Sequence, residues 1–205
     1  MIPERQDDAI GTKPDCIVLA AGASSRMGRP KLHLPFAGRT VLGTTVARAR
    51  EAGLRVIVVG RLGDAALDAL EAEGILVARN PNPEAGMISS LRAGLAFLGA
   101  ERFFFIPGDM PLVSAATYQQ LLETRHPGPV VAACGGRRGH PVLLPATLAQ
   151  AIRELPEGRR LRELLDEAGC LLVETDDPGT IADIDLPLDY ELALAASRLP
   201  SSRVG

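Results

Sequence analysis

Short apolar runs alternate along the chain with segments of helical spacing. Four such runs predict buried strands at residues 16–20, 54–59, 75–78 and 103–106. Apolar residues that recur every three or four positions predict helices at 41–52, 64–73, 87–98, 114–125, 161–168 and 188–196, with Thr40 and Ser114 as N-caps. Two further strands, at 129–134 and 141–144, flank a glycine-rich corner at 135–139, and a last strand is predicted at 171–173.

This alternation predicts the fold class. Strands and helices in regular succession imply right-handed crossovers, and hence an α/β fold of three layers: a mostly parallel, twisted sheet with helices on both faces. The run at 103–106 is the most hydrophobic and is expected at the centre of the sheet. We expect a flexible N-terminal tail at 1–14, a single domain at 15–198 and a frayed C-terminus at 199–205. Ligands of such sheets gather at the carboxyl ends of the strands, so the loops at Ala21 and Gly108 are the first candidates for a site.

Composition narrows the class of partner. The 205 residues are 46% hydrophobic and carry a net charge of −3, which gives no basic field for nucleic acid or an anionic membrane. No apolar run approaches the roughly 18 residues of a membrane span, so we expect a cytoplasmic protein. The three cysteines and three histidines are scattered, without the spacing of a disulfide framework or a zinc site.

The stretch from Leu19 to Lys31 has the composition of a polyanion-binding loop. It reads L-A-A-G-A-S-S-R-M-G-R-P-K and follows directly on the first predicted strand. Small side chains allow main-chain N–H groups to face a phosphate, and Arg26 and Lys31 add positive charge. The spacing matches neither a P-loop nor a dinucleotide-binding fingerprint.

The pattern L-A-A-G-x-S-x-R-M-G-x-x-K in this stretch resembles the signature of the nucleotidyltransferases that make molybdenum-cofactor dinucleotides, and of related cytidylyltransferases. The resemblance implies a Rossmann-like nucleotidyltransferase (GT-A-like) fold. It also implies that Leu19, Ala20, Ala21, Gly22 and Ser24 bind a nucleotide and that Arg26 and Lys31 are catalytic. From the residues alone, without the resemblance, Arg26 and Lys31 could be ordinary solvated charges.

A second segment, N-P-N-P-E-A-G-M-I-S-S-L-R-A-G-L at residues 80–95, is similar to the family's nucleoside-binding segment. The resemblance implies that Gly86 and Ser90 border the nucleoside. From the residues alone, Ser89 and Ser90 in the first turn of a helix could equally donate hydrogen bonds to their own backbone.

The third segment, F-I-P-G-D-M-P-L-V, places Asp109 directly after the most hydrophobic strand. A carboxylate there needs a compensating charge, and magnesium is commonly held by one carboxylate together with substrate phosphates and water. The family's G-D-M-P motif matches here, which implies that Asp109 binds the metal, Mg²⁺ or alternatively Mn²⁺. Asp109 could otherwise cap a helix or stabilise a turn.

A second acidic position lies in the sequence A-D-I-D-L-P-L-D, at residues 182–189, which is similar to a family motif. Asp183 and Asp185 share a face in an extended segment, so either could join Asp109 at the metal or orient the acceptor. We assign Asp185 to the site. Capping of the last helix, by Asp185 or Asp189, is the competing interpretation.

Two elements are candidates for the acceptor side. The corner Gly136-Arg137-Arg138-Gly139-His140-Pro141 resembles a family element that faces the acceptor, which implies a contact from His140, although a lone histidine is more often structural. The segment from Glu157 to Leu165 departs from the family pattern, and Arg162 with a pair of leucines is what remains of it. The divergence leaves the identity of the acceptor in doubt.

The predicted activity is transfer of CMP from CTP to the phosphate of molybdopterin or of the molybdenum cofactor, with release of pyrophosphate. The choice of CTP depends on Ala21, where the guanylyl branch of the family tends to carry glycine. A guanylyltransferase, or a cytidylyltransferase for another phosphorylated acceptor, is the nearest alternative. An alternative of another class is a catalytically silent nucleotide-binding protein that helps to deliver cofactor to a client molybdenum hydroxylase.

Overall fold

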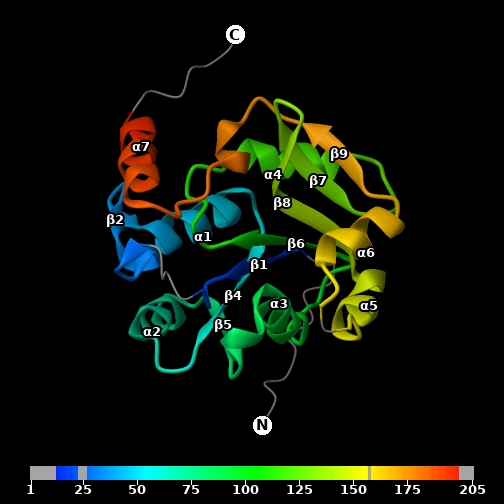
Figure 1. The fold of residues 1–205 in the computed structure, drawn as a ribbon, viewed down its shortest axis with the longest axis horizontal. Helices are drawn as coiled ribbons and strands as arrows, with labels where there is room; N and C mark the ends of the chain where they lie inside the picture. Colours follow the sequence, from blue (N-terminus) through cyan, green and yellow to red (C-terminus); the bar gives the residue numbers. More distant parts are fainter. Residues whose placement is uncertain (1–12, 23–26, 157, 199–205) are drawn as a thin grey trace.

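The computed structural model describes residues 13–22, 27–156 and 158–198, and within these ranges seven strands form one sheet (Figure 1). The strands lie in the order β5-β4-β1-β6-β8-β7-β9. Their bounds are β1 Asp15–Leu19, β4 Arg55–Arg61, β5 Leu76–Asn80, β6 Arg102–Pro107, β7 Val130–Cys134, β8 Arg137–Pro145 and β9 Leu171–Glu174. Among these described strands, β8 runs antiparallel to β6 and β7, and all other neighbours are parallel. The predicted mostly parallel sheet is confirmed.

Helices cover both faces of the sheet, as predicted. One apolar cluster joins the sheet to α1 (Val41–Glu51), α2 (Ala65–Ala72), α4 (Ala115–Glu123) and α7 (Pro187–Ser197). A second cluster, on the opposite face, joins it to α3 (Met87–Leu95), α5 (Ala149–Arg153) and α6 (Leu161–Glu167). Short 3-10 helices connect these elements: η2 Lys31–His33, η3 Pro83–Ala85, η4 Ala146–Leu148 and η5 Pro178–Ile181. Within the described ranges, no helix is both long and apolar enough to cross a membrane.

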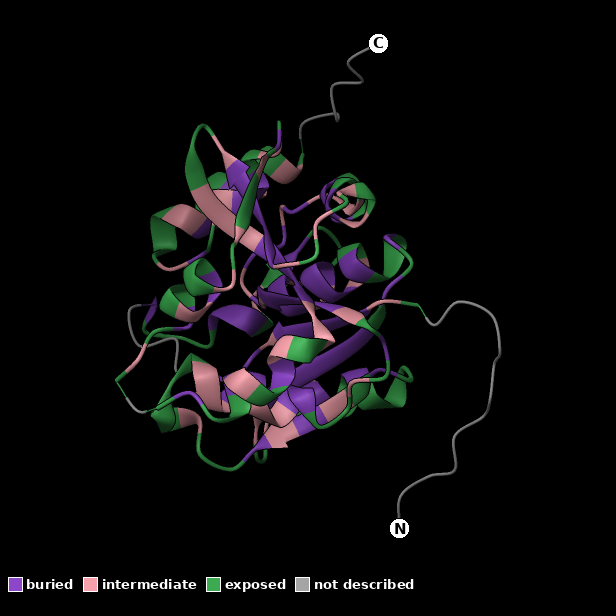
Figure 2. Cartoon of the chain, turned by 90° about the vertical axis from the view of Figure 1, so that its right-hand side faces the viewer, coloured by how far each residue is buried: buried purple, intermediate pink, exposed green. Residues whose placement is uncertain are grey.

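The hydrophobic run at 103–106 forms the middle of the molecule. β6 is the fourth strand from either edge of the sheet, and Phe103 to Ile106 are buried. Their side chains alternate between the two apolar clusters, because successive residues of a strand face opposite sides of a sheet. Figure 2 shows this buried sheet between helices whose outer faces are exposed. Each buried phenylalanine stabilises the fold by roughly 1.5 to 3 kcal/mol relative to an exposed one.

The two predicted N-caps are confirmed. The Thr40 hydroxyl accepts a hydrogen bond from the Gly43 N–H at 2.9 Å at the start of α1, and the Ser114 hydroxyl accepts one from the Thr117 N–H at 3.3 Å at the start of α4. Gly53 follows α1 with a φ of +82°, which glycine adopts without strain.

The glycine-rich corner is tighter than predicted. Gly135 and Gly136 have φ values of +57° and +74° and form a two-residue turn, with Cys134 paired to Arg137 across it. Two successive residues with positive φ suit a tight hairpin, and glycine is favoured at both positions. β8 therefore begins at Arg137 and not at the predicted residue 141, and His140 lies within a strand.

Two small elements were not predicted. β2 (Pro35–Phe36) and β3 (Arg39–Thr40) form a two-stranded hairpin, and the five-residue helix α5 follows η4. Segments this short do not repeat a hydrophobic period often enough to be recognised in the sequence.

Candidate active site

The carboxyl ends of β1 and β6 lie side by side and open onto a cavity of about 720 Å³. The two strands are parallel, with Leu19 opposite Pro107, so the loops that follow them start at the same edge of the sheet. The Gly108 N–H donates to the Leu19 carbonyl at 2.8 Å. A Cβ at Gly108 would lie 2.9 Å from Leu42 Cδ1 and 3.1 Å from the Leu19 carbonyl oxygen. Glycine thus allows the two loops to approach this closely.

The cavity brings together residues from segments that are far apart in the sequence. Its lining includes the predicted site residues Leu19, Ala21, Gly22, Lys31, Gly86, Ser90, Asp109 and Asp185. Ala20 is buried and borders a second cavity, of about 700 Å³. Ser24 and Arg26 lie outside the described residues.

Lys31 connects the two acidic segments. Its Nζ lies 2.5 Å from Asp109 Oδ2 and donates a hydrogen bond to Asp185 Oδ1 at 2.7 Å. The side chains of Lys31 and Asp109 are only 11% and 13% exposed, so water screens this interaction little. Burial disfavours the charged ammonium, but the hydrogen bonds to Asp109 and Asp185 raise the pKa of Lys31 above its ordinary value. Lys31 is therefore a fixed positive charge at neutral pH.

Asp109 has one oxygen that contacts Lys31 and one that has no hydrogen-bond partner in the described part of the chain. Its Oδ1 is shielded from solvent and has no hydrogen-bond partner there. Burial raises the pKa of the Asp109 carboxyl, the nearby Lys31 opposes this shift, and the charge of Asp183 adds to it. A buried carboxylate oxygen without a donor is unfavourable, and an incoming cation would relieve it.

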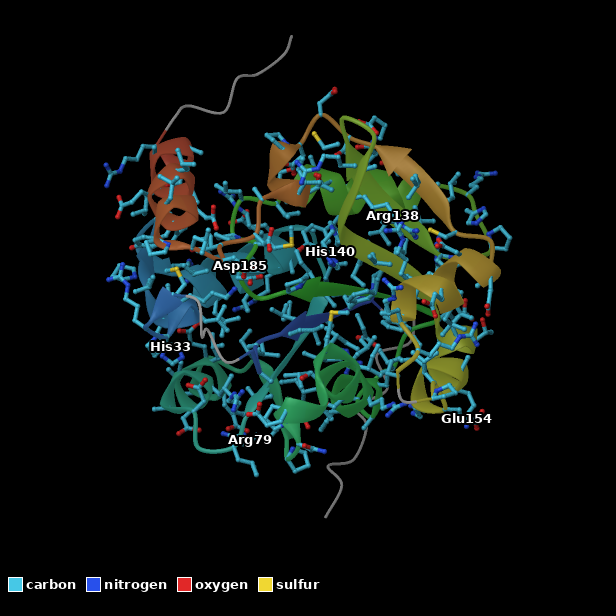
Figure 3. All side chains as sticks on the ribbon, in the orientation of Figure 1. His33, Arg79, Arg138, His140, Glu154 and Asp185 are labelled. Carbon is cyan, nitrogen blue, oxygen red and sulfur yellow. The ribbon has the colours of Figure 1, made fainter. Side chains whose placement is uncertain are left out.

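Asp185 and Asp189 divide the two functions that the sequence left open. Asp189 Oδ2 accepts hydrogen bonds from the backbone N–H groups of Asp185, at 3.1 Å, and Leu186, at 2.7 Å, and so caps α7. Asp185 instead lines the cavity and contacts Lys31. In Figure 3 it lies near the middle of the molecule, on the segment that leads into α7.

Two glycines determine where this acidic segment lies. A Cβ at Gly139 would lie 2.1 Å from the Thr180 carbonyl oxygen, and a Cβ at Gly179 would lie 2.4 Å from the Leu112 carbonyl oxygen. η5 can therefore pack closely against both β8 and the loop after β6. From there the Ile184 N–H donates to the Asp109 carbonyl at 3.1 Å, which places Asp183 and Asp185 on either side of this contact.

The residues present fit a divalent metal ion held largely by its substrate. The described residues contain no group of three or more histidine, cysteine or acidic side chains that could hold a metal alone. They do offer the unpartnered Oδ1 of Asp109 and the carboxylate of Asp185, which both line one cavity. Magnesium prefers such oxygen ligands and completes its octahedral shell with water and phosphate oxygens.

The N-terminus of α3 also lines the cavity. Gly86 precedes the helix with a φ of +84°, and Ser90 lies in its first turns, 4% exposed. The Ser89 hydroxyl donates to the Gly86 and Asn82 carbonyls, which is the local backbone bonding that the sequence allowed for this pair. The Ser90 hydroxyl accepts a hydrogen bond from the buried Asn80.

Arg61 is a cavity residue that the sequence analysis missed. It is the last residue of β4, its Nε donates to the Ala21 carbonyl at 2.9 Å, and its Nη1 lies 2.8 Å from Glu84 Oε1. The guanidinium thus connects the loop after β1 to η3. The sequence did contain an indication of this role: Arg61 is a cation at the carboxyl end of β4. Since β4 is parallel to β1, both strands end at the same edge of the sheet, where ligands bind.

His140 lies on β8 outside the residues that line the cavity. Its ring packs edge-on against Phe105, with 5.4 Å between ring centroids. Its Nδ1 is shielded from solvent and has no partner in the described residues. Burial lowers the pKa of His140 to about 4, although the Phe105 backbone acts in the opposite direction, so the ring is neutral at pH 7.

The structure does not bring Arg162 to the cavity. Its side chain is 71% exposed on α6, where its Nε lies 3.8 Å from Asp166 Oδ2, one helical turn further on. Figure 1 shows α6 beside α5, at the other side of the molecule from α7.

Comparison with known proteins gives one consistent result. The family model described as the MobA-like NTP transferase domain matches residues 16–171. The molybdenum cofactor cytidylyltransferase of Escherichia coli (strain K12) is 32% identical over 179 residues, which cover 86% of this chain and 93% of that protein.

Solved structures agree with the fold. A nucleotidyl transferase from Methanothermobacter superposes with a TM-score of 0.79 at 28% identity, covering 91% of this chain and 98% of the other. A Mycobacterium tuberculosis H37Rv protein in complex with manganese superposes with a TM-score of 0.72 at 28% identity, covering 90% of this chain and 100% of the other. The manganese belongs to that complex, and it accompanies a fold that this chain shares.

Proposed function

Since the chain belongs to the family of MobA-like NTP transferases, we propose that it transfers CMP from CTP to the phosphate of molybdopterin or of the molybdenum cofactor and releases pyrophosphate. The observation that carries this proposal is the convergence of Lys31, Asp109 and Asp185 in one cavity at the carboxyl ends of β1 and β6. Both substrates are anions, so a site for their reaction must first overcome their mutual repulsion.

The proposed reaction needs charge stabilisation more than proton transfer. The acceptor phosphate attacks the α-phosphorus of the nucleotide in line, and pyrophosphate leaves. A phosphate monoester has a second pKa of about 6 and is largely ionised at neutral pH, so no general base is required. The protein contributes positioning and preorganised charge, which act most strongly in a cavity shielded from water.

Each part of the cavity has a role in this scheme. Lys31 supplies the positive charge for the phosphates, and the loop around Ala21 and Gly22 supplies backbone N–H groups. Gly86 and Ser90 border the nucleoside. Asp109 and Asp185 would hold magnesium, with manganese as an alternative. A bound divalent ion neutralises charge that develops on the transferred phosphate.

The acceptor side is the less determined part. His140 is assigned to the acceptor side because its corner resembles the family element that faces the acceptor, and it lies on β8, next to the strand that carries Asp109 at its end. Arg162 is left out because its side chain points into solvent and contacts Asp166. The proposal places the enzyme in the cytoplasm, where a client molybdenum hydroxylase would receive the product.

The test is pyrophosphate release from CTP, GTP and ATP in turn, with magnesium and molybdopterin, and the mass of any dinucleotide product. We expect release with CTP and a cytosine dinucleotide. Release with GTP instead would identify a guanylyltransferase, and release from CTP with a different phosphorylated acceptor would redefine the second substrate. Tight nucleotide binding without release under any of these conditions would favour the silent accessory protein.

A further inference from the structure

Asn80, the last residue of β5, is one of few buried polar residues in the described structure, and it contacts the cavity wall. Asn80 is 3% exposed, at the end of the edge strand β5, where an apolar side chain could also be buried. A buried amide is unfavourable unless it is hydrogen-bonded. The contacts of Asn80 therefore indicate why an amide is present.

The hydrogen bonds of Asn80 fix the orientation of its amide. Its Oδ1 accepts from the Asn82 backbone N–H at 2.9 Å. Its Nδ2 donates to Ser89 Oγ at 2.8 Å and to Ser90 Oγ at 3.0 Å. The flipped amide would place an NH₂ group against the Asn82 N–H, donor against donor, so the network permits only one assignment.

This orientation determines what the two serine hydroxyls can do. Both oxygens accept from Asn80, so both protons must point elsewhere. The Ser89 proton has the Gly86 and Asn82 carbonyls as acceptors. The Ser90 proton has no acceptor in the described residues, and Ser90 lines the cavity, which Ser89 does not.

We propose that Asn80 is a positioning residue that holds the Ser90 hydroxyl as a hydrogen-bond donor directed at an acceptor atom of the nucleotide base. The proposal depends on the proposed CTP-dependent function and extends it to base selection. Cytosine presents a ring nitrogen and a carbonyl oxygen side by side, both acceptors, whereas the corresponding edge of guanine carries two N–H donors. A fixed O–H donor favours the former and opposes the latter.

Asn80→Asp reverses this polarity with almost no change of shape. The aspartate can still accept from the Asn82 N–H, but its second oxygen accepts the Ser90 proton and withdraws it from the cavity. We expect the Kd for CTP, measured by calorimetry with magnesium present, to rise about tenfold, as when a buried hydrogen bond is lost, with kcat changed much less. Ser90→Ala should have a similar effect, and Ser90→Thr, which keeps the hydroxyl, should restore most of the affinity.

The double variant Asn80→Asp/Ser90→Ala separates positioning from a general structural role. If Asn80 acts through Ser90, the double variant binds CTP no more weakly than Ser90→Ala alone. Ser89→Ala is the matched control, because it also loses a bond to Asn80 but does not line the cavity, and its Kd should stay within about twofold of the unmodified protein. If Asn80→Asp does not fold, the neutral Asn80→Ala replaces it, with a smaller loss that must also vanish in the Ser90→Ala background.

Two results would overturn the inference alone: an Asn80→Asp protein that is folded and binds CTP as tightly as the unmodified protein, or losses that add in the double variant. If the unmodified protein does not bind CTP at all, the proposed function fails, and this inference fails with it.

Discussion

The strand β6 divides the molecule into two halves. In the first half, which contains β1 and β4, Lys31 and Arg61 line the cavity and contact groups that border it. In the second half, which contains β8 and α6, two cations contact a nearby carboxylate instead. Arg138 on β8 lies 2.5 Å from Asp166, and Arg162 on α6 faces the same carboxylate at 3.8 Å. Figure 3 shows Arg138 on β8, well away from Asp185 in this view. Among these four described cations, Lys31 and Arg61 line the cavity, and Arg138 and Arg162 do not.

The two halves contribute differently to the site: the first places charges, and the second contributes mainly shape. In the first half, Lys31 and Asp109 lie where little water screens them, which suits the binding of a nucleoside triphosphate at fixed charges. The second half contributes mainly shape near the site, through the close contact of Gly139 with η5 that positions the acidic segment. Variants in the first half should therefore affect catalysis most. Variants in the second half should affect mainly stability, and His140 is the residue there that is also assigned to the acceptor side.

The largest effect is expected from Asp109→Asn in the first half. The variant removes the negative charge and replaces one carboxylate oxygen with an NH₂ group but keeps the shape. Because the proposed metal site depends on that carboxylate, we expect turnover to fall roughly 1000-fold. The measurement is pyrophosphate release with CTP, and a thermal melt serves as the control for folding. Turnover within twofold of the unmodified enzyme would remove Asp109 from the chemistry.

His140→Phe tests the second half through pH. The folded pKa of His140 is about 4 and its ordinary value is 6.5, so between these values the unfolded chain binds more protons. His140 therefore contributes stability that is present above pH 6.5 and is lost as the pH falls toward 4. The unfolding free energy of the natural protein should fall across this window by at most about 3 kcal/mol more than that of His140→Phe.

Urea denaturation of both proteins across that window makes the comparison. Parallel curves would show that the His140 ring is solvated in the folded state. His140 would then be available as a ligand-binding group, and the division between the two halves would break down at this residue.

Arg61→Leu is expected to have an intermediate effect. Loss of the donor to the Ala21 carbonyl and of the Glu84 partner should loosen the nucleotide loop and raise the KM for CTP about tenfold, with a smaller change in kcat. The matched control is Arg79→Gln on β5, whose half-buried side chain contacts Asp68 and Glu71 away from the cavity. Equal effects of the two variants on KM would show that Arg61 acts only as a surface charge.

The smallest effect is expected from Arg162→Ala. Because the side chain is exposed and its ion pair with Asp166 is long, the KM for the acceptor should change less than about twofold. Steady-state kinetics with varied acceptor at saturating CTP provide the measurement. A tenfold rise would place α6 at the acceptor after all, as the family resemblance implied.

Sequence analysis located the first half well, because strand ends and motif residues coincide there. Asp109 follows the most hydrophobic strand, and Lys31 ends a glycine-containing loop after the first strand, so the sequence predicts both at one edge of the sheet. The sequence does not identify Arg61 and Asn80 as site residues, because the role of each depends on contacts with residues from other segments. Asn80 begins the segment 80–95 that resembles the family's nucleoside-binding segment, but the sequence does not show that it ends a strand opposite Arg61.

In the second half the sequence was less informative for a physical reason. The start of β8 depends on the two-residue turn that pairs Cys134 with Arg137. The first residues of this strand are polar, so the hydrophobic pattern alone does not show where the strand begins. The exposure of Arg162 depends on how α6 packs on the sheet. The helical pattern at 161–168 predicted that helix but did not determine which of its polar residues would approach the site.

The contact between Lys31 and Asp185 spans 154 positions of the chain. At 5 to 20 residues per second, synthesis of that interval takes roughly 8 to 30 seconds. Asp109 is made about halfway through this interval, and for the remainder of it the growing chain carries Lys31 and Asp109 without their third partner. The cavity is completed only when the segment before α7 arrives, so a nascent or C-terminally truncated chain has most of the sheet but an unfinished site.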